Sequence, residues 1–264
     1  MFQRGISTLG CAEFTLAQTL ALAARHRLDA VELRALENTT DLPTLFAARH
    51  ATPAKFAAAL TATPVRVVAF DTSFKLIGSN ASDREALLAF VPWAEAAGVR
   101  WLRVFDGGQT ADRAELAEAV ANVRWWQKLR RANGWKIDLM VETHDALTTT
   151  PAILRFVAAA ADCGILWDAH HTWKKGGEDP VATWRAIASH VVHVHVKDSV
   201  DRPSARHPFT YVLPGDGEFP IAPLLTALRA DFSGVVSLEW ERLWHPYLPP
   251  LDDALTAAAA RHWW

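Results

Sequence analysis

Four short segments in the second half of the chain place carboxylates, imidazoles and an ammonium group beside apolar residues. They are Val141–Asp145 (VETHD), Trp167–His171 (WDAHH), His193–Asp198 (HVHVKD) and Leu238–Glu241 (LEWE). Side chains of these types can move protons or bind a metal ion. A single such residue is usually a helix cap, a turn former or a hydrogen-bonded core histidine. The grouping of the four segments therefore decides their interpretation.

The segment Val191–Ser199 (VVHVHVKDS) shows most clearly how such side chains are arranged. Successive side chains of a strand point to opposite faces, so its even-numbered valines share one face and His193, His195 and Lys197 share the other. We expect the valine face to pack against outer helices and the polar row to face the interior of a barrel. His195 is then the candidate ligand, His193 a supporting residue one layer deeper, and Lys197 a residue at the mouth.

Positioning these segments requires a regular alternation of strands and helices. Eight β-like runs alternate with helical segments rich in Ala and Leu, which implies a parallel sheet with helical crossovers. Eight such units predict the α/β class and one (β/α)8 TIM barrel domain spanning residues 1–264. An open doubly wound sheet is the alternative, but no G-x-G-x-x-G follows the first strand. The expected strands are Arg4–Thr8, Ala30–Arg34, Val65–Phe70, Trp101–Phe105, Ile137–Thr143, Ile165–Asp168, Val191–Val196 and Val235–Glu239.

Several helix ends carry capping signals. Thr15–Gln18 (TLAQ) and Ser82–Glu85 (SDRE) have the spacing of a capping box. Thr150 before Pro151 has the order of an N-cap and a first-turn proline, and Gly98 and Gly134 are expected to end helices. These signals separate the helices from the strands that carry the polar segments.

Composition narrows the classes of partner. The 264 residues are 50% hydrophobic and carry a formal net charge of -2, which argues against nucleic-acid binding and against an anionic membrane surface. No run approaches the roughly 18 consecutive apolar residues of a membrane-spanning helix. Cys11 and Cys163 are far apart in sequence and suggest no disulfide framework, as expected for a cytoplasmic protein.

In a barrel, the carboxyl ends of the last four strands would converge at one mouth. Buried carboxylates and imidazoles that converge repel each other or remain desolvated unless something compensates their charge. One divalent metal ion would do so, with oxygens from Glu142, Asp168 and Glu239 and a nitrogen from His195. This donor set favours Mn2+, Mg2+ or Co2+, and Zn2+ is the alternative.

In this order and spacing the motifs resemble the xylose isomerase-like TIM barrel superfamily, in particular its sugar phosphate isomerase/epimerase branch. That branch includes ketose 3-epimerases, hydroxypyruvate isomerases and inosose dehydratases. The resemblance spans nearly the whole chain. Its marks are AVELR (Ala30–Arg34), LRVFDGG (Leu102–Gly108), VETH (Val141–His144), WDAHH (Trp167–His171), HVHVKD (His193–Asp198) and SLEWE (Ser237–Glu241).

The resemblance places the family's metal ligands on Glu142, Asp168, His195 and Glu239, the residues proposed above. It further implies that Glu142 and Glu239 remove and return a proton beside a carbonyl of a small keto-sugar or polyol derivative, through an enediolate. A metal-dependent lyase that dehydrates or β-eliminates a keto-polyol or keto-glycoside is the alternative, since it begins with the same proton abstraction. Glu241 and His144 are reserve bases.

The resemblance also suggests substrate contacts. Its D-x-x-H pattern places a substrate-binding histidine at His171, and His144 is a further candidate. Epimerases of the branch often contact substrate through an arginine after the seventh strand; Arg202 and Arg206 both fit, and we take Arg206 as the candidate.

Lys197 has three interpretations that the sequence leaves open. It could form a Schiff base, contact substrate oxygens, or pair with Asp198, and we take it as a substrate contact. The metal set explains the site without a covalent lysine.

Other functions fit less well. A DNA-repair endonuclease of the superfamily has extra histidines on strands two and three, where this chain offers Glu32 and Asp71. A metal hydrolase of the amidohydrolase kind has its H-x-H on the first strand, and a catalytically silent barrel would not need the complete ligand set. We expect a small, unphosphorylated carbohydrate substrate, because no Gly-rich loop at a helix start offers a phosphate cradle. For the oligomeric state, we expect a homodimer or a homotetramer.

Overall fold

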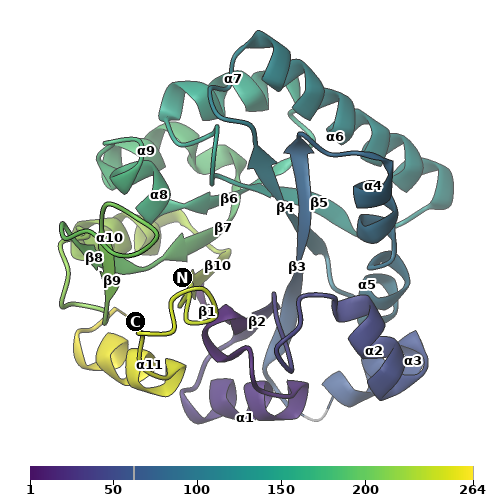
Figure 1. The fold of residues 1–264 in the computed structure, drawn as a ribbon, viewed down its shortest axis with the longest axis horizontal. Coiled ribbons are helices and arrows are strands. Elements are labelled where there is room, and N and C mark those ends of the chain that lie inside the picture. Colours follow the sequence, from purple (N-terminus) through teal and green to yellow (C-terminus); the bar gives the residue numbers. More distant parts are fainter. Residues whose placement is uncertain (62, 264) are drawn as a thin grey trace.

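Eight parallel strands close a barrel in the computed structural model, which describes all residues except Ala62 and Trp264 (Figure 1). Neighbours around the barrel follow the order β1-β10-β7-β6-β5-β4-β3-β2, and β1 pairs with both β10 and β2. The predicted single (β/α)8 TIM barrel is confirmed. The barrel strands are β1 Gln3–Ser7, β2 Ala30–Leu33, β3 Arg66–Ile77, β4 Trp101–Gly107, β5 Asp138–Glu142, β6 Gly164–Asp168, β7 Val191–Val196 and β10 Val235–Leu238.

Helices surround the barrel and carry the chain from the end of one strand to the start of the next (Figure 1). None of the described helices is long and apolar enough to cross a membrane. Short 3-10 helices lie at Thr8–Cys11 and Ala188–His190. The α-helices are α1 Leu16–Arg25, α2 Leu42–His50, α3 Pro53–Leu60, α4 Ala81–Leu88, α5 Val91–Ala97, α6 Arg113–Asn133, α7 Thr150–Ala159, α8 Ala169–Lys174, α9 Pro180–Ile187, α10 Ile221–Asp231 and α11 Leu251–Ala260.

Apolar side chains form two clusters because alternate residues of each strand face opposite sides of the barrel wall. The large cluster contains strand residues such as Val141 and Val194 together with helix residues such as Phe156, so it lies between the strands and the helices. A small cluster of Ala69, Met140 and Leu166 lies inside the barrel. On β5, Glu142 follows Met140 on that inner face, so the barrel interior changes from apolar to polar toward the strand ends.

The structure confirms some of the helix ends predicted from the sequence and corrects others. Thr15 and Gln18 form the predicted capping box of α1, and Gly98 and Gly134 end α5 and α6 with left-handed backbones at φ of 66° and 67°. The predicted box at Ser82–Glu85 is wrong, because α4 begins earlier and is capped by Asn80 with Asp83.

The start of α7 also differs from the prediction. Thr149 is its N-cap, so Thr150 is already inside the helix. The side chain of Thr150 pairs with Glu178 and Thr183, and its backbone N–H donates to Glu178 Oε1 at 2.9 Å. The threonine that precedes Pro151 is therefore used for a contact between segments and not for capping.

A register shift on β7 overturns one expectation about its valines. Pairing with β6 passes from Ile165–Val191 directly to Leu166–His193, so Val192 is an extra residue. Val194 and Val196 join the outer cluster as predicted, but Val192 packs against the cluster inside the barrel. The bulge explains the difference, because the alternation of faces starts again after it.

A small antiparallel ribbon follows β7, formed by β8 Asp198–Val200 and β9 Thr210–Val212. Asp198 anchors the loop that returns from it, because its carboxylate accepts backbone N–H groups of Ser199, Gly215, Gly217 and Phe219 at 2.9–3.1 Å. The turn of residues 214–219 (PGDGEF) is thus held against the end of β7. The ribbon was not predicted from the sequence.

Asp106 near the end of β4 plays a similar role for a neighbouring loop. Its carboxylate accepts the backbone N–H groups of His144, Asp145 and Leu147, at 3.2, 2.8 and 2.7 Å. All three belong to the loop after β5. The loop that carries His144 is therefore positioned by an acid from the adjacent strand.

Candidate metal centre and active site

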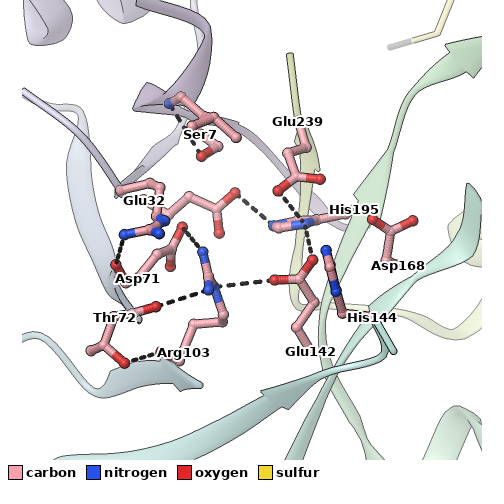
Figure 2. Close-up of polar contacts among 12 residues, drawn as sticks. Ser7, Glu32, Asp71, Thr72, Arg103, Glu142, His144, Asp168, His195 and Glu239 are labelled. Carbon is pink, nitrogen blue, oxygen red and sulfur yellow. Dashed lines mark hydrogen bonds and ion pairs between the residues drawn. The ribbon is translucent and has the colours of Figure 1, made fainter. Parts of the chain in front are cut away.

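Four side chains meet where β5, β6, β7 and β10 end. Glu142, Asp168, His195 and Glu239 each offer a ligand atom, and these atoms all lie within 4.8 Å of one another. All four residues are buried. Figure 2 shows their side chains converging from neighbouring strands. The structure thus brings together the set chosen from the sequence.

Asp168 is oriented by the helix that it caps. One carboxylate oxygen accepts the backbone N–H of His171 at 2.8 Å, as the N-cap of α8. Its own backbone N–H donates to Thr143 Oγ1 at 2.9 Å, which ties the ends of β5 and β6 together. The second oxygen, Oδ2, faces the other candidate ligands and lies 2.8 Å from Lys197 Nζ and 3.1 Å from His171 Nδ1.

His195 is held by Glu32 from the opposite side of the barrel. The Nε2 atom lies 2.8 Å from Glu32 Oε1, so Nδ1 faces the other ligands, 3.4 Å from Glu239 Oε1 and 3.9 Å from Glu142 Oε1. Burial disfavours the charged imidazole, but the carboxylates of Glu32 and Glu239 outweigh burial and hold its pKa well above 6.5. Without a metal ion the imidazole is thus protonated, and Nδ1 is the nitrogen that faces the other candidate ligands.

Glu142 has a buried arginine as its neighbour. Arg103 Nε lies 3.1 Å from Glu142 Oε2, and Arg103 also donates to the Thr72 carbonyl at 2.9 Å and lies 3.9 Å from Asp71 Oδ2 (Figure 2). Burial raises the pKa of the Glu142 carboxyl, and Arg103 opposes this only in part. Glu239 differs, because Lys197 and His195 overcome burial and hold its pKa well below 4.5.

Lys197 lies between three carboxylates. Its Nζ is 2.8 Å from Asp168 Oδ2 and 2.6 Å from Glu241 Oε1, and it also pairs with Glu239. Although burial opposes the charge, these neighbours keep the pKa of the lysine well above 10.5. An ammonium held in this way is a poor Schiff-base nucleophile. The pairing with Asp198 considered from the sequence is not made, because that carboxylate is occupied by backbone N–H groups.

The donor set fits a divalent cation. Glu142 Oε2, Asp168 Oδ2 and His195 Nδ1 are buried and lack a hydrogen-bond partner of good geometry among the described residues. Acidic side chains also outnumber basic ones around them, since Arg34, Arg103, Lys197 and His195 face six carboxyl groups, one of which, that of Asp71, has a pKa that burial raises to about 8. A bound cation would satisfy the three atoms and reduce the excess negative charge. The six carboxyl groups are those of Glu32, Asp71, Glu142, Asp168, Glu239 and Glu241.

Of the predicted substrate contacts, His171 and His144 lie beside the four candidate ligands, whereas Arg206 does not. His171 is buried, with Nδ1 3.1 Å from Asp168 Oδ2 and 3.2 Å from the Thr143 carbonyl. His144 is half-buried and pairs with Asp145 at 2.8 Å, and its ring stands edge-on to His171. Arg206 is exposed, and its Nη1 donates to the Trp244 carbonyl at 3.3 Å. In the described part of the chain no contact joins Arg206 to the four ligand residues.

Several residues that face the site were not predicted to do so from the sequence. Glu32, Asp71 and Arg103 come from β2, β3 and β4, and all three are buried within the barrel. Tyr211 on β9 donates its hydroxyl to Glu241 Oε1 at 2.8 Å. The available signal was a charged side chain at an inward position of an otherwise apolar strand, as in AVELR and LRVFDGG.

A family model described as xylose isomerase-like TIM barrel matches residues 20–263. The chain belongs to this family. No curated protein sequence matches the chain. Members of the xylose isomerase-like family are mostly enzymes, among them isomerases, epimerases and dehydratases.

Solved structures of other proteins share the fold. The probable 3-DHS dehydratase AsbF of Bacillus anthracis has a TM-score of 0.79 at 17% identity over 97% of both chains. The IolI protein with a zinc atom has 0.74 at 17% identity, over 98% of this chain and 96% of its own. A D-tagatose 3-epimerase-like protein has 0.69 at 14% identity, over 99% and 97%. At these identities the likeness establishes the fold alone.

Proposed function

We propose that the chain is a divalent-metal-dependent isomerase or epimerase that removes a proton beside a carbonyl of a small keto-sugar or keto-polyol derivative. The observation that carries the proposal is the convergence of four buried ligand atoms within 4.8 Å at the carboxyl ends of the barrel strands. Similarity to a protein that holds zinc and to a D-tagatose 3-epimerase-like protein supports it.

Glu142, Asp168, His195 and Glu239 would hold the ion. When bound, a divalent cation would polarise the substrate carbonyl and stabilise the negative charge that develops on its oxygen. Mn2+, Mg2+ and Co2+ suit the three carboxylates and one imidazole, and Zn2+ is the alternative.

Glu142 and Glu239 are the proposed proton carriers. They extend from β5 and β10, the outer strands of the arc β10-β7-β6-β5, so they approach the space between them from two sides. One carboxylate removes the proton from the carbon beside the carbonyl, and the other returns a proton to the opposite face. Arg103 beside Glu142 and Lys197 beside Glu239 hold the two side chains in place.

The second candidate is a metal-dependent lyase, favoured by the likeness to a probable 3-DHS dehydratase. It shares the first proton abstraction. The intermediate would then expel a hydroxyl group from the neighbouring carbon and would not be reprotonated.

The test combines metal analysis of the purified chain with exchange of substrate hydrogen in deuterated water. D-fructose, D-tagatose, hydroxypyruvate and 3-DHS are supplied to protein loaded with each metal in turn. We expect metal-dependent exchange, and a loss of about 100- to 10,000-fold in Glu142→Gln and Glu239→Gln. Glu85→Gln, an exposed position on α4, is the control and should behave as wild type.

The products separate the two reactions. Exchange with retention of all oxygen atoms supports the isomerase or epimerase, whereas an unsaturated product supports the lyase. Full exchange activity in both glutamine variants, or activity that does not depend on any metal ion, would sink the proposed mechanism.

A further inference from the structure

Arg34 is an arginine at the barrel mouth that the proposed reaction leaves without a role. It follows β2 directly, and only 7% of its surface is exposed. Thr8 fixes the backbone here, because its Oγ1 accepts the N–H groups of Arg34 and Ala35 at 2.8 and 3.0 Å. The backbone of Arg34 is therefore fixed at the end of β2, across the barrel from β6.

The guanidinium of Arg34 has almost no partner of its own. A guanidinium carries five N–H donors, yet its hydrogen bonding to described residues is limited to one long contact of 3.5 Å to the Asp71 carbonyl. No carboxylate oxygen of the described residues lies within 4.0 Å of its nitrogens. Arg103 differs, since it forms an ion pair with Glu142 at 3.1 Å, donates a hydrogen bond to the Thr72 carbonyl at 2.9 Å and lies 3.9 Å from Asp71 Oδ2.

Arg34 nevertheless lies beside the candidate site. Its guanidinium carbon is 5.9 Å from the centre of the Phe105 ring, and that of Arg103 is 4.0 Å from the same ring. Burial and Arg103 lower the pKa of Arg34 to about 10, while Asp71, Glu142 and Glu239 oppose the decrease. The side chain is thus a cation at neutral pH, and a buried cation without a hydrogen-bonded anion is unfavourable.

We propose that Arg34 binds a carboxylate group of the substrate, so that the enzyme acts on keto-acids of the polyol type and not on neutral sugars. This inference rests on the proposed function, because it assumes that the substrate's carbonyl is placed at the metal centre. A planar guanidinium matches a carboxylate through two parallel hydrogen bonds, and one positive charge balances one negative charge. A phosphate dianion would need a second free cation, but Arg103 and Lys197 are already paired.

The test compares ligands that differ only in the charged group. D-tagatose and D-tagaturonate share a carbon chain and a ketone, but a terminal CH2OH of the first is a carboxylate in the second, and D-fructose and D-fructuronate form a second pair. Binding of each to the metal-loaded full-length chain is measured by calorimetry, with hydroxypyruvate as a smaller keto-acid. We expect at least one carboxylate to bind more tightly than its neutral counterpart by about 10-fold or more.

Variants of Arg34 test whether this residue causes the preference for carboxylates over neutral sugars. Arg34→Gln should weaken carboxylate binding about 10- to 100-fold and leave the affinity for neutral sugars unchanged, and Arg34→Lys should restore part of the loss. The unfolding transition of Arg34→Gln should match wild type, because no ion pair is lost. Arg100→Gln, with an exposed arginine at the opposite end of the barrel, removes the same charge and should change nothing.

The two proposals fail in different ways. If no compound shows metal-dependent hydrogen exchange, the proposed function is lost, whereas carboxylate binding that requires Arg34 would still support an acid-binding site. If every carboxylate in the panel binds no better than its neutral counterpart, or if Arg34→Gln weakens both members of a pair equally, the carboxylate inference is overturned even when exchange is seen.

Discussion

Glu32 determines which nitrogen of His195 faces the ligand set. Its Oε1 lies 2.8 Å from His195 Nε2, and its Oε2 lies 3.2 Å from His193 Nε2. His193 in turn pairs with Ser237 at 2.8 Å. A carboxylate behind a ligating histidine fixes the ring orientation and raises the basicity of the free nitrogen. His193 therefore supports the site through Glu32, as its position one layer deeper suggested.

We predict that Glu32→Gln lowers the affinity of the site for Mn2+ or Co2+ about 10- to 100-fold without abolishing folding. The amide keeps the shape of the side chain but removes the charge that faces Nε2. Metal titration monitored by calorimetry measures the change, and Glu37→Gln, a change outside the barrel interior, is the control. Equal affinities for wild type and Glu32→Gln would show that Glu32 does not orient the ligand.

The four ligand candidates could be predicted from sequence because each lies at or next to the carboxyl end of a strand and contributes its own side chain. Glu32 and Arg103 could not, since their meaning depends on partners across the barrel that lie far away in sequence. The partners of Lys197 could not be predicted for the same reason, although its position at the mouth was. Asp198, its neighbour in the chain, binds the backbone of a loop, and Lys197 pairs instead with carboxylates from other strand ends.

At the scale of elements, Asp198 holds the ribbon and the loop that follows it against the end of β7. Four backbone N–H groups point at one carboxylate, and Gly217 approaches so closely that an added Cβ would lie 2.0 Å from Asp198 Oδ1. A side chain at position 217 would therefore collide with the carboxylate that holds the loop.

We predict that Asp198→Ala destabilises the protein by about 3 kcal/mol, because several buried N–H groups lose their acceptor. Equilibrium unfolding in urea measures the change. Asp253→Ala, at an exposed position on α11, is the matched control and should stay within about 0.5 kcal/mol of wild type. A similar small effect for both variants would contradict the anchoring role of Asp198.

A second element-scale prediction concerns the contact between α1 and α11. Asp252 accepts hydrogen bonds from Arg25 at 2.8 Å and His26 at 2.6 Å, and these lower its pKa from 3.8. A carboxyl whose folded pKa is lowered stabilises the fold above its unfolded pKa, and this contribution is lost as the pH falls through the folded value.

The free energy of unfolding of Asp252→Asn should therefore be lower than that of wild type at neutral pH, by less than about 1 kcal/mol for an exposed pair. The difference should shrink toward zero as the pH falls below 3.8. Urea titrations at a series of pH values measure it. A difference that stays constant over this range would rule out the carboxylate charge as its source.

The strands and helices could largely be predicted from patterns within each segment. The strand positions follow from β-like apolar runs, and the end of α6 follows from Gly134. The bulge at Val192 and the ribbon β8–β9 could not be predicted, since both are set by pairing with other strands. The start of α4 at Asn80 was missed because two capping signals overlap in the sequence.

At the scale of the whole molecule, closure of the sheet brings the residues of the candidate metal centre together from distant segments of the chain. The candidate ligands come from residues between Glu142 and Glu239, and Glu32 supports them from the first half of the chain. The regular alternation of strands and helices was enough to predict this closure. An ion bound by all four ligands would therefore stabilise the barrel as a unit.

We predict that a metal ion at about 100 times its dissociation constant stabilises the fold by about 2.7 kcal/mol, and raises the midpoint of thermal unfolding by roughly 5–10 °C. Thermal unfolding with and without Mn2+, Mg2+, Co2+ or Zn2+ measures the effect, and a chelator should reverse it. Asp168→Asn should lose most of the shift. If none of the four ions moves the midpoint of the wild type, the proposed metal centre is wrong.

The loops of the mouth are not independent units. Asp106 belongs to β4, yet its carboxylate binds the backbone of the loop after β5, including His144. A designer who exchanged the β5 loop for one from another barrel would have to keep or transfer this aspartate as well. The natural unit for recombination at this edge is therefore a pair of adjacent strand ends with the loop between them, and variation in one strand constrains the sequences that its neighbour can accept.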